Sequence, residues 1–282
     1  MTDLYKMLKM SRQNVSQKLH RAAVKAIAEG AVLELASEIR KDHPQMGCRK
    51  MYWKSFSRMP LGRDYCEQIM ISNGFRVHFP PNFKRTTYSI GKLYYPNLIE
   101  GLTLNGLNQV WQTDITYYEV NQAFYYLVFI EDIYSRRIVG WSVDHSLWAQ
   151  ANLRAVKGAI ELRNCDLKGL IHHSDRGGQY IDKDYTDLLI EHKIQPSMCK
   201  QAWQNAYCER VNGIIKNEYL KNWKIESLVQ LEEAVQKAVN LYNNDRPHWK
   251  LPNRSTPCEF EKKVKAFRIK PTMKIYSPQV ET

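Results

Sequence analysis

The stretch VWQTDITYYEV, residues 110–120, is rich in β-branched and aromatic residues, which is typical of a β-strand. Two segments of similar composition follow it, QAFYYLVFIEDIY at 122–134 and RRIVGWSVD at 136–144. Beyond them helical and strand-like patterns alternate: a helix at 146–163, a strand at 168–175, a helix at 183–193, a strand at 194–198 and a helix at 205–222. This order predicts an α/β domain with a mixed five-stranded sheet flanked by helices.

The chain of 282 residues has a formal net charge of +12 and a pI near 9.3, but its charge is unevenly distributed. Residues 1–110 contain 17 basic and 8 acidic residues, residues 111–260 contain 18 and 19, and residues 261–282 contain 6 and 2. Two basic arms therefore surround a near-neutral centre. Such arms suit a polyanion such as DNA, because each neutralised phosphate releases counterions. A basic protein without such a partner would have the same net charge.

The cysteines and the apolar segments place the chain in a reducing, aqueous compartment. None of the six cysteines forms a C-x-x-C pair, which favours free thiols over a zinc site or a disulfide framework. No secretory signal is recognisable, and the longest strongly apolar run, FYYLVFI at 124–130, is too short to span a bilayer. We expect a cytoplasmic, nucleoid-associated protein.

Residues 1–80 are helical in pattern and basic. In residues 1–44 Ser11 can cap a helix, and a short helix, a turn at 9–11 and a second helix resemble a helix-turn-helix; a further helix at 31–44 would end at Pro44. Residues 45–80 predict two more helices, broken at Met59-Pro60 and closed by Asn73-Gly74. This second element is either DNA-binding or a solvated basic face. The candidate DNA contacts here are Arg12, Arg49, Lys50, Lys54 and Arg63. Residues 81–108, with prolines, glycines and no clear period, predict a linker.

Two aspartates are predicted to meet at the sheet. Asp114 lies inside the strand 110–120, and Asp175 lies at the very end of the strand 168–175, in HHSDRGGQYID, residues 172–182. If these strands are neighbours, the two carboxylates come close together, which is unfavourable unless a cation neutralises them. Hard oxygen ligands without clustered His or Cys point to Mg2+ or Mn2+. The alternative for Asp175 alone is a polar turn.

A third carboxylate is expected from the helix 205–222. Glu209 shares one helical face with Asn212, Gly213 and Lys216, which leaves room for a phosphate backbone beside a metal. Glu209 taken alone would be an ordinary exposed glutamate. If it points to solvent, Glu218 or Asp132 would be the third acid.

The motifs NQVWQTDITY, EDIYSRRIVGWSVD, HHSDRGGQYID, NAYCERVNGIIKNEYL and YNNDRPHWKLPNRSTPCEFE occur in the same order as in retroviral-integrase-like transposases of bacterial insertion sequences. Over nearly its whole length the chain resembles the second-frame product, OrfB, of the insertion-sequence-three family. The resemblance implies an RNase H-like integrase core at 109–262 followed by a basic tail at 263–282, and an integrase-associated helix-turn-helix at 45–80. It also implies Mg2+-dependent cleavage and strand transfer at insertion-sequence ends. The implied partners are double-stranded DNA, other copies of the chain and OrfA.

The resemblance also assigns roles to residues. Asp114, Asp175 and Glu209 match the family's DDE triad, which holds two Mg2+ ions for which Mn2+ can substitute. Lys216 matches the basic residue that contacts the transposon end, and Arg176 and Asn212 are further candidate DNA contacts. One departure is that 33 residues separate Asp175 from Glu209, two fewer than is usual in the family. We expect the deletion to lie in the loop before the helix, with Trp203 replacing a flexible segment.

Other functional classes share some of these features. A transposase-derived regulator could bind DNA through residues 1–80 without chemistry, and the shorter loop favours that alternative while the intact triad opposes it. A Mg2+ nuclease acting on RNA–DNA hybrids would have the same fold but would not need the basic helical arms.

Overall fold

The computed structural model describes residues 7, 10–78, 94–146, 149–200 and 202–275, with the side chains of residues 202 and 203 left out. The chain divides into two compact units, residues 1–79 and 80–282, which are described separately. Among the described helices, none combines the length and the apolar character that crossing a membrane would require.

The N-terminal unit is built on one long helix, α2 (Arg12–Asp42). The side chain of Ser11 accepts a hydrogen bond from the backbone N–H of Asn14, which confirms the predicted cap. The separate helix expected at 31–44 is wrong, because Gly30 does not interrupt α2 and no proline occurs before Pro44. The short helix and turn expected before Ser11 lie almost entirely outside the described residues.

Two further helices complete this unit, α3 (Cys48–Lys54) and α4 (Arg63–Ser72), with a short 3-10 turn, η1 (Phe56–Arg58), between them. The predicted break at Met59-Pro60 and the predicted end near Gly74 are confirmed. Gly74 has a φ of +83°, a conformation that glycine adopts without strain. The small core joins the C-terminal half of α2 to α3 and α4 through Val32, Ala36, Ile39, Met46, Met51, Cys66 and Met70.

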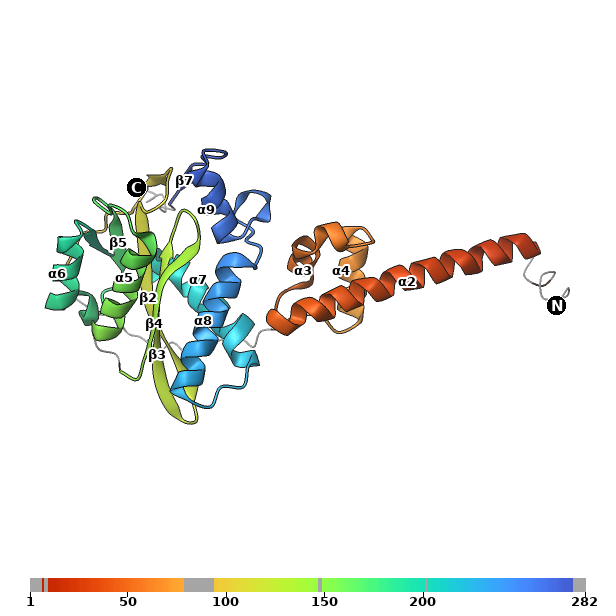
Figure 1. Cartoon of the computed structure of the whole chain (residues 1–282), viewed down its shortest axis with the longest axis horizontal. Helices are drawn as coiled ribbons and strands as arrows, with labels where there is room; N and C mark the ends of the chain where they lie inside the picture. Colours follow the sequence, from red (N-terminus) through yellow and green to blue (C-terminus); the bar gives the residue numbers. More distant parts are fainter. Residues whose placement is uncertain (1–6, 8–9, 79–93, 147–148, 201, 276–282) are drawn as a thin grey trace, which may run out of the picture. The chain divides into compact units, whose positions relative to one another are not determined.

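The second unit contains the predicted mixed sheet of five strands, in the order β4-β3-β2-β5-β6 (Figure 1). Its members are β2 (Val110–Val120), β3 (Ala123–Asp132), β4 (Arg137–Asp144), β5 (Ile171–Ser174) and β6 (Gln195–Met198). β2 pairs antiparallel with β3 and parallel with β5. The adjacency of the first and fourth strands, on which the predicted meeting of the aspartates depends, is therefore present.

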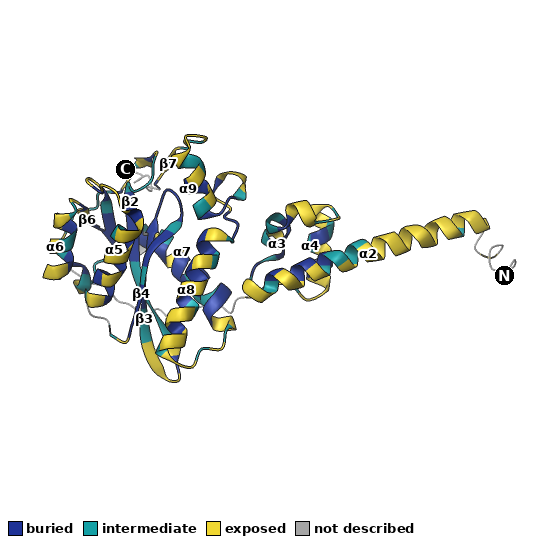
Figure 2. Ribbon diagram, in the orientation of Figure 1, coloured by how far each residue is buried: buried dark blue, intermediate teal, exposed yellow. Residues whose placement is uncertain are grey.

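Helices cover both faces of this sheet (Figure 1). Because side chains alternate along a strand, Val128 and Ile130 of β3 pack into one core with α5 (Ala149–Arg163) and α6 (Lys183–Glu191). Leu127 and Phe129 pack into the other core with α7 (Ala206–Ile214) and α8 (Leu228–Asn244). The strands are accordingly buried over much of their length, whereas the outer faces of the helices are exposed (Figure 2).

Short elements connect and extend these layers. η2 (Gly178–Tyr180), η3 (Ala202–Asn205), η5 (Leu220–Asn222) and η6 (Pro252–Arg254) are 3-10 turns, and η4 (Ile215–Tyr219) is a π-helical turn that continues α7. β1 (Thr103–Leu104) pairs with β7 (Met273–Lys274). The described part of the expected linker is thus packed on the core unit, because Ile99 and Leu104 are buried there, and part of the expected tail pairs with it.

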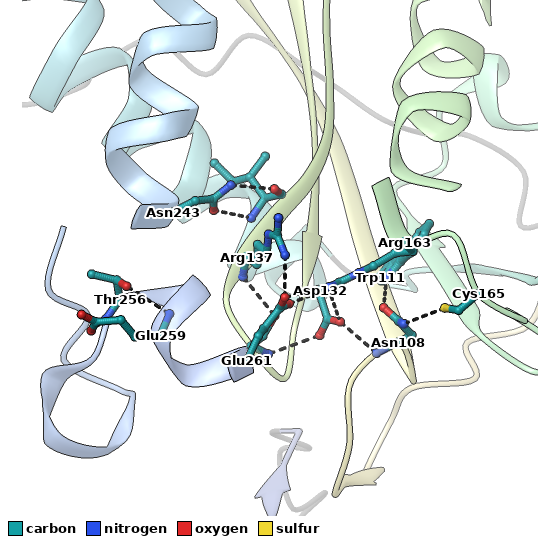
Figure 3. A network of polar contacts seen from close by, with 12 residues as sticks. Asn108, Trp111, Asp132, Arg137, Arg163, Cys165, Asn243, Thr256, Glu259 and Glu261 are labelled. Atoms are coloured by element: carbon teal, nitrogen blue, oxygen red, sulfur yellow. Dashed lines mark hydrogen bonds and ion pairs between the residues drawn. The ribbon is translucent and has the colours of Figure 1, made fainter. Parts of the chain in front are cut away.

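A buried ionic network fixes α9 (Pro257–Lys265) to the sheet (Figure 3). Arg163 of α5 donates to Asp132 of β3 at 2.9 Å and to both carboxylate oxygens of Glu261 of α9, at 2.7 and 2.9 Å. Arg137 of β4 donates to Glu261 at 2.7 Å. Each of these two acids therefore has a guanidinium partner, and the network joins the β3–β4 hairpin to α5 and α9.

Candidate active site

Gln112, a buried side chain of β2, fixes the N-terminal end of α7. Its Oε1 accepts hydrogen bonds from the backbone N–H groups of Tyr207 and Cys208, at 3.1 and 3.2 Å, and its Nε2 donates to the carbonyl of Gln204 at 2.8 Å. These two N–H groups belong to the first turn of α7, where no intrahelical acceptor exists. A residue far away in sequence thus caps the helix that carries Glu209.

One stripe of α7 and η4 runs alongside one face of β2. Four helical residues rise about 6 Å, and two strand residues span about 6.7 Å, so every fourth residue of the helix can meet every second residue of the strand. Three successive contacts follow this rule: the N–H of Cys208 with Gln112 at 3.2 Å, Nδ2 of Asn212 with Oδ2 of Asp114 at 2.7 Å, and Nζ of Lys216 with Oγ1 of Thr116 at 2.6 Å.

The carboxyl group of Asp114 is subject to the negative charges of two other acids, Asp175 and Glu209. Burial, and then the charges of Asp175 and Glu209, raise the pKa of Asp114 to about 8. Burial also raises the pKa of Asp175, although Asp175 accepts a hydrogen bond of 2.9 Å from the N–H of Gly177, and partial desolvation raises the pKa of Glu209. None of the three acids forms an ion pair with arginine or lysine within the described residues. The charge of Lys216 lowers the pKa of Asp114, but by less than burial and the two acids raise it, so within the described residues the negative charge is only partly offset.

This donor set has the chemistry of a site for a hard divalent cation. It consists of carboxylate oxygens with a neighbouring amide, and the nearby thiol of Cys208 donates instead to the carbonyl of Gln112 at 2.8 Å. In the part of the chain that the structure describes, however, no three His, Cys, Asp or Glu side chains stand close enough together to hold an ion. The residue types and the unfavourable like charges fit such a cation, and binding would require the carboxylates to draw closer.

The two alternative third acids are engaged elsewhere. Glu218 accepts hydrogen bonds from Nε and Nη2 of Arg246 at 2.7 and 2.8 Å, and both side chains are buried. Asp132 is paired with Arg163. Glu209 is exposed on the first turn of α7, and its charge, like that of Asp175, acts on Asp114.

The residues around Asp175 stabilise the local backbone. Nδ1 of His173 pairs with Oγ of Ser197 at 2.9 Å, and the ring of His172 pairs with the hydroxyl of Tyr185. Burial lowers the pKa of His172 to about 3 and of His173 to about 4, so both rings are neutral at pH 7. Arg176 donates to the carbonyl of Cys199 at 3.0 Å, which ties the loop after β5 to the end of β6.

The remaining predicted DNA contacts lie in different surroundings. Arg12 is exposed at the start of α2, Lys50 and Lys54 are partly exposed on α3, and Arg49 and Arg63 are exposed but form ion pairs with Glu67 and Asp64. In the core unit, Nζ of Lys216 lies 5.3 Å from the ring centroid of Tyr117. The predicted role of Trp203 lies outside the described side chains.

Comparisons with known proteins relate the core unit to integrases and transposases. Two family models described as integrase core domain match residues 105–202 and 191–257. A putative transposase for the insertion element IS986/IS6110 of Mycobacterium tuberculosis is 36% identical over 146 residues, covering 49% of this chain and 52% of the relative. The IS629 transposase of Shigella sonnei is 35% identical over 159 residues, covering 55% and 52%. The chain thus aligns with about half the length of these curated relatives.

Two weaker similarities cover more than half of the chain. An uncharacterized 31 kDa protein of the insertion element IS600 of Shigella sonnei is 29% identical over 208 residues, covering 72% of this chain and 76% of the relative. Among solved structures, the HTLV-2 integrase catalytic core domain in complex with magnesium is 23% identical with a TM-score of 0.45, covering 58% of this chain and 99% of that one.

Proposed function

Because this chain belongs to the integrase-core transposases of insertion sequences, in the insertion-sequence-three family, we propose that it cleaves DNA strands at insertion-sequence ends and joins them to target DNA. The observation that carries the proposal is the carboxyl group of Asp114, whose pKa is raised to about 8 by burial and by Asp175 and Glu209. A protein gains nothing in stability from such an arrangement, whereas a divalent cation would relieve it.

The three carboxylates and Asn212 have distinct proposed roles in this reaction. Asp114, Asp175 and Glu209 would hold two Mg2+ ions, for which Mn2+ could substitute, and the bound ions would supply Lewis-acid activation of the attacking and leaving oxygens. Asn212 donates to Oδ2 of Asp114 and so orients the carboxylate toward its neighbours. Water attacks in the cleavage step and a DNA 3′-hydroxyl attacks in the joining step, which makes the chain a phosphoryl transferase without a covalent protein intermediate.

Basic residues outside the carboxylates bind the DNA. Lys216, held beside β2, faces a phosphate of the transposon end, and burial lowers its pKa relative to an exposed lysine. The N-terminal unit, with Arg12, Arg49, Lys50, Lys54 and Arg63, binds duplex DNA without taking part in the chemistry. Several copies of the chain assemble on the two paired ends of the insertion sequence. The OrfA protein is a further partner, either as a separate chain or fused to this one.

The proposal is tested with the full chain and labelled duplex DNA that carries the ends of its own element. Strand nicks at the terminal nucleotides and joined products are expected with Mg2+ or Mn2+ and are expected to disappear with EDTA. Products that persist in EDTA would contradict the metal-dependent mechanism.

A DNA-binding regulator is the second candidate function, and the spacing of 33 residues between Asp175 and Glu209 favours it. The capping of α7 by Gln112 favours catalysis, because it keeps the helix in register with β2 despite the shorter loop. Tight binding of the ends without any nick, in both Mg2+ and Mn2+, would establish the regulator.

A further inference from the structure

A second polar site lies beside α7, in a pocket of about 260 Å³. It is formed by the end of β3, the β3–β4 turn, α7, the end of α8 with the segment after it, and β7. The side chains on which the inference depends are Glu131, Arg136, Tyr207, Arg210, Lys250 and Lys274. We call this the basic pocket.

The floor of the basic pocket holds a buried acid with an unused oxygen. Glu131 is 2% exposed, and its Oε2 has no hydrogen-bond partner within the described residues. The guanidinium of Arg136 also lies in the floor and stacks 4.3 Å from the ring centroid of Tyr207. Buried polar atoms are nearly always hydrogen-bonded in proteins, so an orphan acceptor that lines a pocket points to a ligand with an N–H or O–H donor.

The mouth of the pocket is positively charged. Arg210, Lys250 and Lys274, which we call the cationic rim, are exposed, and within the described part of the chain none forms an ion pair with a carboxylate. With Arg136 they place four cations against the one acid that lines the pocket. Unpaired cations around a concave site suit a phosphate group.

The basic pocket is separate from the carboxylates but close to them in the fold. Arg210 follows Glu209 directly, and one residue turns an α-helix by about 100°. The two side chains therefore leave α7 in different directions, Glu209 toward Asp114 and Arg210 toward the pocket. A DNA strand that reaches the carboxylates needs to pass only this helix to reach the rim.

We propose that the basic pocket binds a single unpaired nucleotide of a DNA strand, with its phosphate on the cationic rim and its base against Glu131. A nucleotide is the ligand class that combines a phosphate with N–H donors, and a carboxylate accepts well from the amino group of cytosine. Taking up an unpaired base costs less than extracting a paired one. The assignment of the nucleotide to DNA rests on the proposed function.

The test measures binding in EDTA, where no cleavage occurs, of a short blunt duplex and of the same duplex ending in unpaired cytosines. The double variant Arg210→Ala/Lys250→Ala is compared with Lys157→Ala/Lys168→Ala, which removes the same charge from exposed positions outside the pocket. The rim variant should weaken binding of the extended duplex by about tenfold or more, which is 1.4 kcal/mol. Its affinity for the blunt duplex should equal that of the control variant.

Two further measurements separate the possible ligands. Glu131→Gln should change the preference between unpaired cytosine and unpaired thymine, since thymine lacks the amino group, and an unchanged preference would overturn the placement of the base. Deoxycytidine monophosphate that competes as well as the extended duplex would make the ligand a free nucleotide and overturn the assignment to DNA. Equal losses for the rim and control variants on both duplexes would overturn the pocket itself. Because no metal is present, none of these outcomes depends on whether the chain cleaves DNA.

Discussion

Two groups of buried acids in the core unit have opposite electrostatic surroundings. Asp132 and Glu261 share the guanidinium group of Arg163, and Arg137 also donates to Glu261 (Figure 3). The two arginines hold the pKa of Glu261 below its ordinary value despite burial. Asp114 faces two further acids instead, and its pKa rises to about 8. Burial also raises the pKa of Asp132, despite Arg163, whereas Glu261, which has two guanidinium partners, has a lowered pKa. Burial therefore acts in both groups, and the countercharges decide how far it is offset.

The difference separates a structural site from one prepared for a ligand. The acids in the Arg163 network have their countercharges within the chain, and they fix α5, β3, β4 and α9 relative to one another. The acids around Asp114 form no such ion pair within the described residues; neutral donors such as Asn212 and the N–H of Gly177 support them, and the charge of Lys216 offsets only part of their repulsion. We therefore expect substitutions in the first group to change stability and substitutions in the second group to change activity.

The largest expected effect is on catalysis by Asp114→Asn. Loss of a metal-binding carboxylate removes several kcal/mol of transition-state stabilisation, so strand cleavage should fall by about a thousandfold or more. The affinity for DNA, which we assign to the basic residues, should change by no more than a few-fold. The exposed Asp166 provides the matched control, Asp166→Asn. Cleavage at a tenth of the parent rate in Asp114→Asn would refute the metal assignment.

The next effect is on stability, in Glu261→Gln. Removing one member of a buried ion pair leaves uncompensated charge and costs about 3–5 kcal/mol. The urea midpoint of the core unit should therefore fall strongly, while cleavage per folded molecule stays near the parent value. Glu191→Gln, at an exposed position on α6, serves as the control. If the free energy of unfolding fell by less than about 1 kcal/mol, Glu261 would contribute no more than an acid in an exposed ion pair, and the structural role of the network would be refuted.

A smaller effect concerns pH and the metal-free protein. Because the pKa of Asp114 is raised to about 8 in the folded state, the folded chain holds a proton that the unfolded chain has released, over the window from about pH 4 to 8. The free energy of unfolding of the parent should therefore fall as pH rises through this window. Asn cannot titrate, so the stability of Asp114→Asn relative to the parent should increase from pH 5 to pH 8.

Unfolding in urea with EDTA at several pH values measures this difference. Glu131, whose pKa burial raises to about 7, titrates in both proteins and cancels in the comparison. A difference between mutant and parent that does not change with pH would show that Asp114 is ionised throughout.

Local pattern was sufficient to predict much of the fold. The five strands match their predicted segments closely, because alternation and β-branched composition are properties of neighbouring residues. The position of Asp175 at the end of the fourth strand followed from the same segments, whereas the pairing of that strand with the one that contains Asp114 was a condition that the structure meets. The continuous helix α2 was not predicted, because a separate helix was expected at 31–44 where the structure has one helix from Arg12 to Asp42.

The contacts that build the two acid groups could not be predicted in this way. Gln112 caps α7 across 96 residues, and Arg163 reaches Glu261 across 98. No periodicity connects positions so far apart, and a polar residue inside a strand gives no sign of its partner. Gln112 lies in WQTD, two residues before Asp114 on the same face of β2, and that alternation was the available signal.

The smallest expected effect extends the comparison to an exposed pair in the N-terminal unit, Arg49 with Glu67 at 3.0 Å. Exposed ion pairs contribute about 0.2–1 kcal/mol, so Arg49→Ala and Glu67→Gln should each lower stability by no more than that. Their effects on DNA should differ in sign. Arg49→Ala removes a proposed phosphate contact and should reduce the slope of log affinity against log salt by about 0.9. Glu67→Gln frees the guanidinium and should tighten binding, so weaker binding by both variants would show that Arg49 serves only its pair with Glu67.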